Sequence, residues 1–344
     1  MLLKQHHVAK VAWTDGNYNG NIERTAKLFV PYGTAVLAYN VGVVLWGAYV
    51  RATGSGAGCG NHWPLCNGEV VPQSPGTATW IEFTHRATSG IDVLLVGFLL
   101  VWAFRAFPRA HLARLGAVLS AVFLTTEALI GAALVKLEHV AHNASVGRSY
   151  SLSAHLINTL TLLACLTMTV WWARGGARLR IGGRPAWLAA PAVLLVLVTG
   201  ISGVIAALGD TLFPATSLAA GLRQDFDPSA SIFLRLRLAH PILALATAAW
   251  LVAYAVLTYQ TRGAKPFARA VLALVALQIT AGAANLLLLA PVWTQMLHLL
   301  LADLLWIELV LLAAVTLQTS CLSADLLMDE MAPSARRLER SSSK

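Results

Sequence analysis

Charged side chains are scarce in this sequence of 344 residues. Asp, Glu, Lys and Arg make up 12% of it, and 57% of the residues are hydrophobic. Soluble domains carry about 25% charged residues. This deficit excludes the pair of soluble domains that the length alone would allow, and it indicates a chain that is surrounded mainly by lipid.

Two further features are missing. Residues 1–28 contain no apolar core of a cleavable leader, so we expect no signal peptide. The four cysteines form no Cys-x-x-Cys or Cys-x-x-Cys-His motif, which excludes covalent attachment of a c-type haem.

Eight hydrophobic runs are long enough to cross a membrane, since a spanning helix needs roughly 20 apolar residues. They lie at residues 29–51, 80–104, 113–135, 149–173, 186–208, 232–260, 267–290 and 295–320. Most of them contain Gly, Ser, Thr or Asn, which suit contacts between membrane helices. The predicted fold class is therefore all-α, a polytopic membrane protein with eight transmembrane helices.

The basic residues are distributed unequally over the connecting segments. With a cytoplasmic N-terminus, 18 of the 25 Lys and Arg fall in cytoplasmic segments and six in outer ones, while Arg86 lies inside the second helix. This asymmetry predicts an N-in, C-in orientation. The basic loops would face the anionic cytoplasmic leaflet, which accounts for the net charge of +9. Nucleic acid is therefore not an expected partner.

The histidines indicate an internal repeat. Each even-numbered predicted helix holds one histidine near its outer end, and the odd-numbered helices hold none. These four residues are His85, His155, His240 and His298. The third and seventh helices share a Gly-Ala-Ala sequence, within residues 126–134 and 277–285. We therefore predict two four-helix bundles related by a pseudo-two-fold axis along the membrane normal.

The repeat sets the predicted boundaries of the chain. Residues 1–28 form a cytoplasmic N-terminal segment, 29–180 the first half, 181–320 the second half, and 321–344 a cytoplasmic C-terminal tail. We expect neither half to fold alone.

Ionisable side chains within membrane spans are candidates for function. One such histidine could serve packing alone, but four at equivalent depths favour metal ligands. Two histidines on facing helices can bind an iron from both faces of a porphyrin, whereas zinc needs more ligands close together, so haem is the better prediction. Nearby arginines could pair with the haem propionates. These are Arg51, Arg86, Arg235 and Arg237.

Two other groups of residues have more than one interpretation. Glu82 lies three residues before His85 and shares its helix face, so it could act on a bound group or be an interfacial residue favoured by the helix dipole. Cys59 and Cys66 lie in an outer loop, where disulfides persist. They could form a disulfide, a redox-active thiol pair or two free thiols.

Several motifs together resemble the bacterial haem A synthase family over about residues 30–320. The first helix and loop carry Gly47-Ala-Tyr-Val-Arg-Ala-Thr-Gly-Ser-Gly56 and Trp63-Pro-Leu-Cys-Asn-Gly68. The second helix carries Glu82-Phe-Thr-His-Arg86. His155 in Ser-Ala-His-Leu and the run from Gln278 to Asn285, followed by His298, are similar to later helices of that family.

The resemblance implies oxidation of the ring methyl group of haem O to a formyl group, which gives haem A for terminal oxidases. It implies that His240 and His298 bind a resident haem b. It also implies that His85 and His155 bracket the haem O substrate. Glu82 would then be the catalytic group near the reacting methyl.

The resemblance further implies a multi-pass protein of the bacterial plasma membrane, with its haem sites towards the outer face. Haem O synthase, an electron-transfer partner, membrane lipid and a second copy of the chain are the expected partners. The sequence departs from the family in two places. Pro241 follows His240 where the family usually has arginine. Some members also carry a second cysteine pair in the loop between the fifth and sixth helices, whereas here no cysteine lies between Cys165 and Cys321. The alternatives are a dihaem b-type electron-transfer cytochrome and a non-enzymatic haem transporter or chaperone.

Overall fold

The computed structural model describes residues 16–318 except residues 142 and 230, with side chains from Lys27 onward. Residues 1–15 of the predicted N-terminal segment and the whole of the predicted tail, 321–344, lie outside the described residues. Within the described part the chain is helical, with two isolated bridges and no strand. The all-α prediction is confirmed.

Ten α-helices and one short 3-10 helix follow one another along the chain. They are α1 (Gly16–Ala52), η1 (Ser55–Ala57), α2 (Thr77–Ala106), α3 (Leu112–Lys136), α4 (Val146–Ala173), α5 (Gly183–Leu212), α6 (Leu218–Phe226), α7 (Ile232–Arg237), α8 (Ala239–Thr258), α9 (Lys265–Leu287) and α10 (Val292–Leu317). Eight segments of these helices are long and apolar enough to span a membrane, with α7 and α8 together forming the sixth. The predicted number of spans is confirmed.

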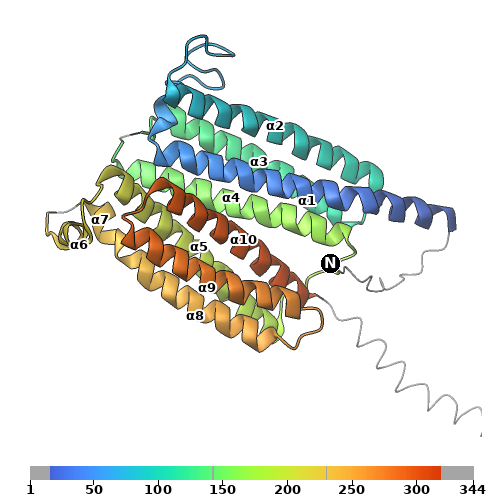
Figure 1. Cartoon of the computed structure of the whole chain (residues 1–344). Coiled ribbons are helices and arrows are strands. Elements are labelled where there is room, and N and C mark those ends of the chain that lie inside the picture. Colours follow the sequence, from blue (N-terminus) through green and yellow to red (C-terminus); the bar gives the residue numbers. More distant parts are fainter. Residues whose placement is uncertain (1–15, 142, 230, 319–344) are drawn as a thin grey trace, which may run out of the picture.

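The long helices group into two sets of four (Figure 1). Helix α1 packs on α2, α2 on α3, α3 on α4, and α4 closes the set against α1. Helices α5, α8, α9 and α10 contact one another in the same cyclic order. The two sets meet through α4, which touches α5 and α10, and through α1, which touches α10.

Polar contacts and a common core join the two sets. The Nη1 atom of Arg51 on α1 donates to the carbonyl of Ala207 on α5 at 3.0 Å, and its Nη2 atom donates to Oε1 of Gln295 on α10 at 2.8 Å. Trp306 on α10 donates through its indole N–H to the carbonyl of Leu160 on α4 at 2.7 Å. These contacts tie the two sets of helices together.

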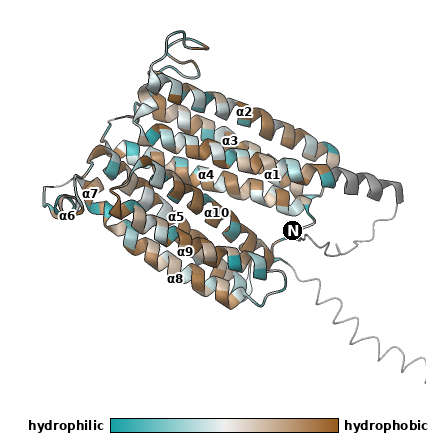
Figure 2. Ribbon diagram, in the orientation of Figure 1, coloured by the Kyte–Doolittle hydropathy of each residue, from teal (hydrophilic) through white to brown (hydrophobic). Residues whose placement is uncertain are grey.

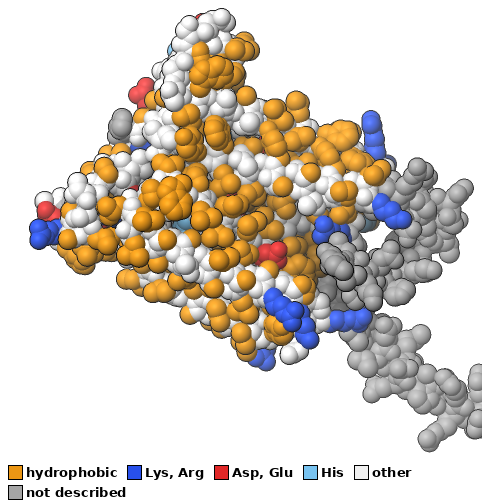
Figure 3. Space-filling model, viewed as in Figure 1, with side chains coloured by type: hydrophobic (Ala, Val, Ile, Leu, Met, Phe, Trp, Pro, Cys, Tyr) orange, Lys and Arg blue, Asp and Glu red, His pale blue; other side chains and the backbone are white. Residues whose placement is uncertain are grey.

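The outer surface is apolar along the helices. Figure 2 shows hydrophobic residues along most of their length, and Figure 3 shows hydrophobic side chains over much of the visible face, with Lys and Arg mainly at its ends. Large side chains that point outward include Leu94, Phe98 and Leu194. Such a continuous apolar surface is unusual for a soluble monomer and suits contact with lipid tails.

The structure adds two features to the predicted helix pattern. Helix α1 begins at Gly16, inside the segment predicted to precede the first span. The loop between the fifth and sixth spans contains α6, whose first turn is capped because the Ser217 hydroxyl accepts from the amide of Ala220 at 3.1 Å.

Candidate functional site

Each of the four membrane histidines packs against a glycine on the preceding long helix. A Cβ atom added at Gly47 would lie 2.9 Å from Cε1 of His85, and one at Gly131 would lie 4.0 Å from Cε1 of His155. The second half repeats this arrangement. A Cβ atom at Gly203 would lie 3.0 Å from Cε1 of His240, and one at Gly282 would lie 3.0 Å from Cε1 of His298. At Gly47, Gly203 and Gly282 the imidazole edge occupies the space that the missing side chain leaves, whereas at Gly131 the contact is at an ordinary van der Waals distance.

The rings of His240 and His298 face each other across the second bundle. Their centroids are 6.4 Å apart and their planes are nearly perpendicular, at 89°. Two metal–nitrogen bonds of about 2 Å each, together with the two ring radii, span about that length. The separation therefore suits two axial ligands on opposite sides of one iron.

The free ring nitrogens also suit metal binding. Ser202 donates its hydroxyl hydrogen to the carbonyl of Thr199, so its oxygen accepts from Nδ1 of His240 at 2.9 Å. This bond leaves Nε2 of His240 unprotonated and able to bind a metal. The Nδ1 atoms of His85 and His298 are buried and have no hydrogen-bond partner.

Among the side chains that the structure describes, no three His, Cys, Asp or Glu gather into a group that could hold a metal ion. The histidines lie in pairs instead, and a pair is what a porphyrin iron needs as axial ligands. The glycines leave room beside each ring, and apolar helices surround it. The residues present therefore fit two haem groups, one in each four-helix set.

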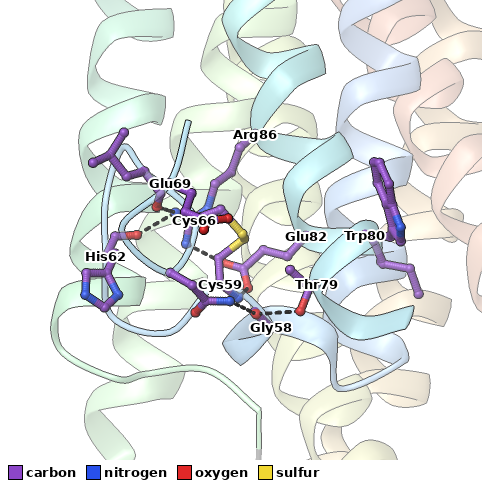
Figure 4. The surroundings of a disulfide bond; sticks show 12 residues. Gly58, Cys59, His62, Cys66, Glu69, Thr79, Trp80, Glu82 and Arg86 are labelled. Carbon is purple, nitrogen blue, oxygen red and sulfur yellow. Dashed lines mark hydrogen bonds and ion pairs between the residues drawn. A yellow bond between two sulfur atoms is a disulfide. The ribbon is translucent and has the colours of Figure 1, made fainter. Parts of the chain in front are cut away.

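Glu82 is a buried carboxylate on α2, one helix turn before His85. It is 3% exposed, and both of its oxygens have partners. Oε2 accepts from the backbone amide of Cys59 at 2.8 Å, and Oε1 pairs with Nη2 of Arg86 at 2.5 Å. Figure 4 shows Glu82 pointing from α2 towards the loop that carries the disulfide.

The loop between α1 and α2 is tied down over this carboxylate. Cys59 and Cys66 form a disulfide that closes a small ring in the loop (Figure 4). The carbonyl of Gly58 accepts from the hydroxyl of Thr79 at 2.8 Å, and a Cβ atom at Gly58 would lie 2.5 Å from the backbone of Ala78. Glycine is thus required for the loop to approach the first turn of α2 and bring the Cys59 amide to Glu82.

The four arginines predicted to face haem propionates all have protein partners. Arg51 bridges α1 to α5 and α10, as described above. Arg86 donates through Nη1 to the carbonyls of His62 and Leu65 at 2.5 Å and 2.6 Å. Arg235 donates to the carbonyl of Pro228.

Arg237 pairs with two carboxylates. It lies 2.7 Å from an oxygen of Asp210 and 2.5 Å from an oxygen of Asp225, on α5 and α6. The helix is interrupted just after it, at Leu238, because Pro241 cannot donate a hydrogen bond to the Arg237 carbonyl four residues earlier. Pro241 thus ends α7 next to the ligand candidate His240.

Sequence reasoning assigned no role to Glu127, which the structure places at the other histidine of the first pair. Its Oε1 atom is 3.3 Å from Nδ1 of His155. The signal that could have identified it is its position in the repeat, where Glu127 and Gln278 each precede the glycine of their Gly-Ala-Ala sequence by four residues.

Comparisons with known proteins identify the family of this chain. The family model COX15-CtaA, described as cytochrome oxidase assembly protein, matches residues 32–310. A Protoheme IX farnesyltransferase of Thermus thermophilus is 46% identical over 292 residues, which cover 83% of this chain and 48% of that protein. The chain thus spans about half the length of this relative.

Shorter matches are found with proteins named Heme A synthase. That of Geobacillus kaustophilus is 41% identical over 114 residues, which are 33% of this chain and 35% of that protein. That of Bacillus mycoides is 47% identical over 93 residues, 27% of this chain and 30% of that protein. Since the family model covers most of the chain, this chain belongs to the COX15-CtaA family of cytochrome oxidase assembly proteins.

Proposed function

We propose that this chain is a haem A synthase, a membrane oxidoreductase that converts the ring methyl group of haem O to a formyl group. The observation that carries the proposal is a repeated histidine–glycine arrangement, together with the buried, ion-paired Glu82 one helix turn before His85 in the first half. Two similar ligand pairs with different surroundings suit one resident haem and one substrate haem.

The two halves have different tasks in this proposal. Residues 181–320 hold haem b between His240 and His298, with Ser202 fixing the tautomer of His240. Residues 29–180 hold haem O between His85 and His155. A bound haem b would supply an iron that exchanges electrons, and an electron-transfer partner outside this chain completes the oxidation.

Glu82 is the proposed catalytic group. Its carboxylate is held by Arg86 and by the amide of Cys59, and burial keeps water away from it. A fixed negative charge stabilises positive character that develops at the methyl carbon, and it needs no reorganisation during the reaction. The disulfide loop supports this arrangement because it holds the Cys59 amide in place.

The farnesyltransferase relatives support a place beside haem O synthesis. This chain matches 48% of such a protein, so the farnesyltransferase activity that its name describes fits the unmatched half. Farnesylation of protohaem gives haem O, the substrate proposed here. We therefore propose haem O synthase as a partner in a bacterial plasma membrane, with the haem sites towards the outer face and with haem A delivered to terminal oxidases.

Haem extraction tests the proposal most directly. We expect cells that make haem O to accumulate haem A when they express this chain, and Glu82→Gln to lower the yield at least tenfold. A tenfold loss is about 1.4 kcal/mol of transition-state stabilisation. Bound haem b is expected to remain, because the second pair is unchanged.

Glu69→Gln is the matched control, because Glu69 is an exposed carboxylate in the disulfide loop next to Glu82 and its side chain only accepts from the amide of Gln73. Haem A at the wild-type level in Glu82→Gln would exclude Glu82 from the mechanism. A wild-type protein that holds two haems but yields no haem A would be an electron-transfer cytochrome, and one that yields no new pigment would be a haem carrier.

A further inference from the structure

The carboxylate of Glu127 is fixed on the face of α3 that meets α4. Asn158 donates through Nδ2 to its Oε2 at 2.5 Å, and the hydroxyl of Thr159 donates to its Oε1. Asn158 is itself held, since its Nδ2 also donates to the carbonyl of Phe123 at 2.8 Å and its Oδ1 accepts from the hydroxyl of Thr126 at 2.6 Å. Both oxygens of Glu127 are thus held by residues that follow His155 by one turn of α4.

This carboxylate lies against the ring nitrogen of His155 that is not needed for a metal. Nδ1 of His155 is 3.3 Å from Oε1, a charge contact without the alignment of a hydrogen bond. A carboxylate at that distance favours the tautomer with hydrogen on Nδ1, which leaves Nε2 for iron. Partners of this kind fix the orientation of ligating histidines and raise their basicity.

The second bundle has a neutral amide at the corresponding place. Glu127 precedes Gly131 by four residues, and Gln278 precedes Gly282 by four. The Nε2 atom of Gln278 is 3.3 Å from Nε2 of His298, so this amide also touches the imidazole, although at the other nitrogen. The repeat therefore places a carboxylate against the imidazole of His155 and an amide against that of His298, at different ring nitrogens.

We propose that Glu127 is a positioning residue that orients His155 and makes it a stronger electron donor to a bound iron than His298. The inference rests on the proposed function, in which His155 binds the substrate haem. A negative charge beside an axial ligand stabilises the ferric state, because that state carries one more positive charge. The haem of the first bundle then has a lower reduction potential than it would have with an amide at residue 127.

A redox titration of the purified full-length protein, isolated from cells that make haem O, tests this inference. We expect two one-electron transitions in the optical spectrum. Glu127→Gln should change the ferric-to-ferrous ratio of one haem at least tenfold towards ferrous, a rise of 59 mV for one electron. The other transition should stay where it is.

Gln278→Glu is the reciprocal variant, and it should lower the potential of the haem that Glu127→Gln leaves unchanged. Glu127→Asp keeps the charge and should retain most of the wild-type potential. A residue that only holds α3 to α4 would change haem content or stability in these variants without moving either potential in this pattern.

The outcomes separate the inference from the proposed function. Two haems bound in Glu127→Gln with both potentials at the wild-type values would overturn the role of Glu127 and leave the synthase proposal intact. Wild-type protein that binds a single haem, held by His240 and His298, would overturn both. Should Glu127→Gln fail to accumulate, an unshifted potential in Gln278→Glu would overturn the inference.

Discussion

At the scale of single residues, the ligand candidate His298 depends on a close contact with a glycine. Gly282 leaves space that a Cβ atom would fill to within 3.0 Å of His298. We expect Gly282→Leu to displace the imidazole and to remove most of the bound haem b. The absorption spectrum of the purified protein should lose its six-coordinate low-spin bands to the same extent as in His298→Ala.

Gly90→Leu is the control for this prediction, because a Cβ atom at Gly90 would meet nothing within 4 Å. It places the same side chain in a membrane helix, at an exposed position of α2. Full haem content in Gly282→Leu would contradict the ligand assignment of His298.

At the scale of elements, the loop between α1 and α2 depends on its close approach to the start of α2. We expect Gly58→Ala to lift this loop, because the added carbon would lie 2.5 Å from the backbone of Ala78. Limited proteolysis of the native protein should then cleave the loop several times faster, and haem A yield should fall because Glu82 loses the Cys59 amide.

The matched variant is Gly76→Ala in the same loop. Gly76 has an ordinary negative φ of −72° and open space around its Cα atom. It should behave as the wild type in both measurements. Equal cleavage rates in the two variants would show that the loop does not depend on the contact at Gly58.

The helices also show how far the sequence could predict this protein. Runs of apolar residues predict the eight spans because a run of about 20 such residues crosses the membrane as a helix, which satisfies its own backbone hydrogen bonds. Helix α6 could not be seen this way, since it is only nine residues long and contains Arg223, Gln224 and Asp225. The end of α7 before His240 could have been predicted from Pro241, because proline removes a backbone hydrogen bond within its own helix.

The site was predictable only in part, for a related reason. The spacing of Glu82 and His85 lies within one helix turn and is visible in the sequence. The contact of Glu127 with His155 joins α3 to α4, and the bonds of Arg51 join α1 to residues on α5 and α10. Such contacts depend on how helices pack, which the periodicity of one helix does not determine.

At the scale of the whole molecule, the orientation in the membrane is still a prediction from the basic residues. Single cysteines can test it at Val70 in the first long loop and Ile181 between the two bundles, both highly exposed. In a background with Cys165→Ser and Cys321→Ser, an impermeant maleimide on intact cells should label Val70→Cys. Ile181→Cys should react only after permeabilisation.

Labelling of the two positions in the opposite order would reverse the orientation and place the histidine pairs towards the cytoplasm. Labelling of both positions on intact cells would contradict the odd number of spans between them. The native disulfide of Cys59 and Cys66 serves as an internal control, since it should stay unlabelled until a reductant is added.

The four histidines lie at nearly the same level in their spans. They follow the first residue of the respective span by eight, nine, eight and six residues. At 1.5 Å per residue, their heights differ by about 4.5 Å at most. An electron that passes from a haem held by the first histidine pair to one held by the second moves almost parallel to the membrane plane. It therefore crosses little of the transmembrane potential, which is worth about 2.3 kcal/mol per charge for each 100 mV. Under the proposed function, electron transfer between the two bundles then depends little on the membrane potential of the cell.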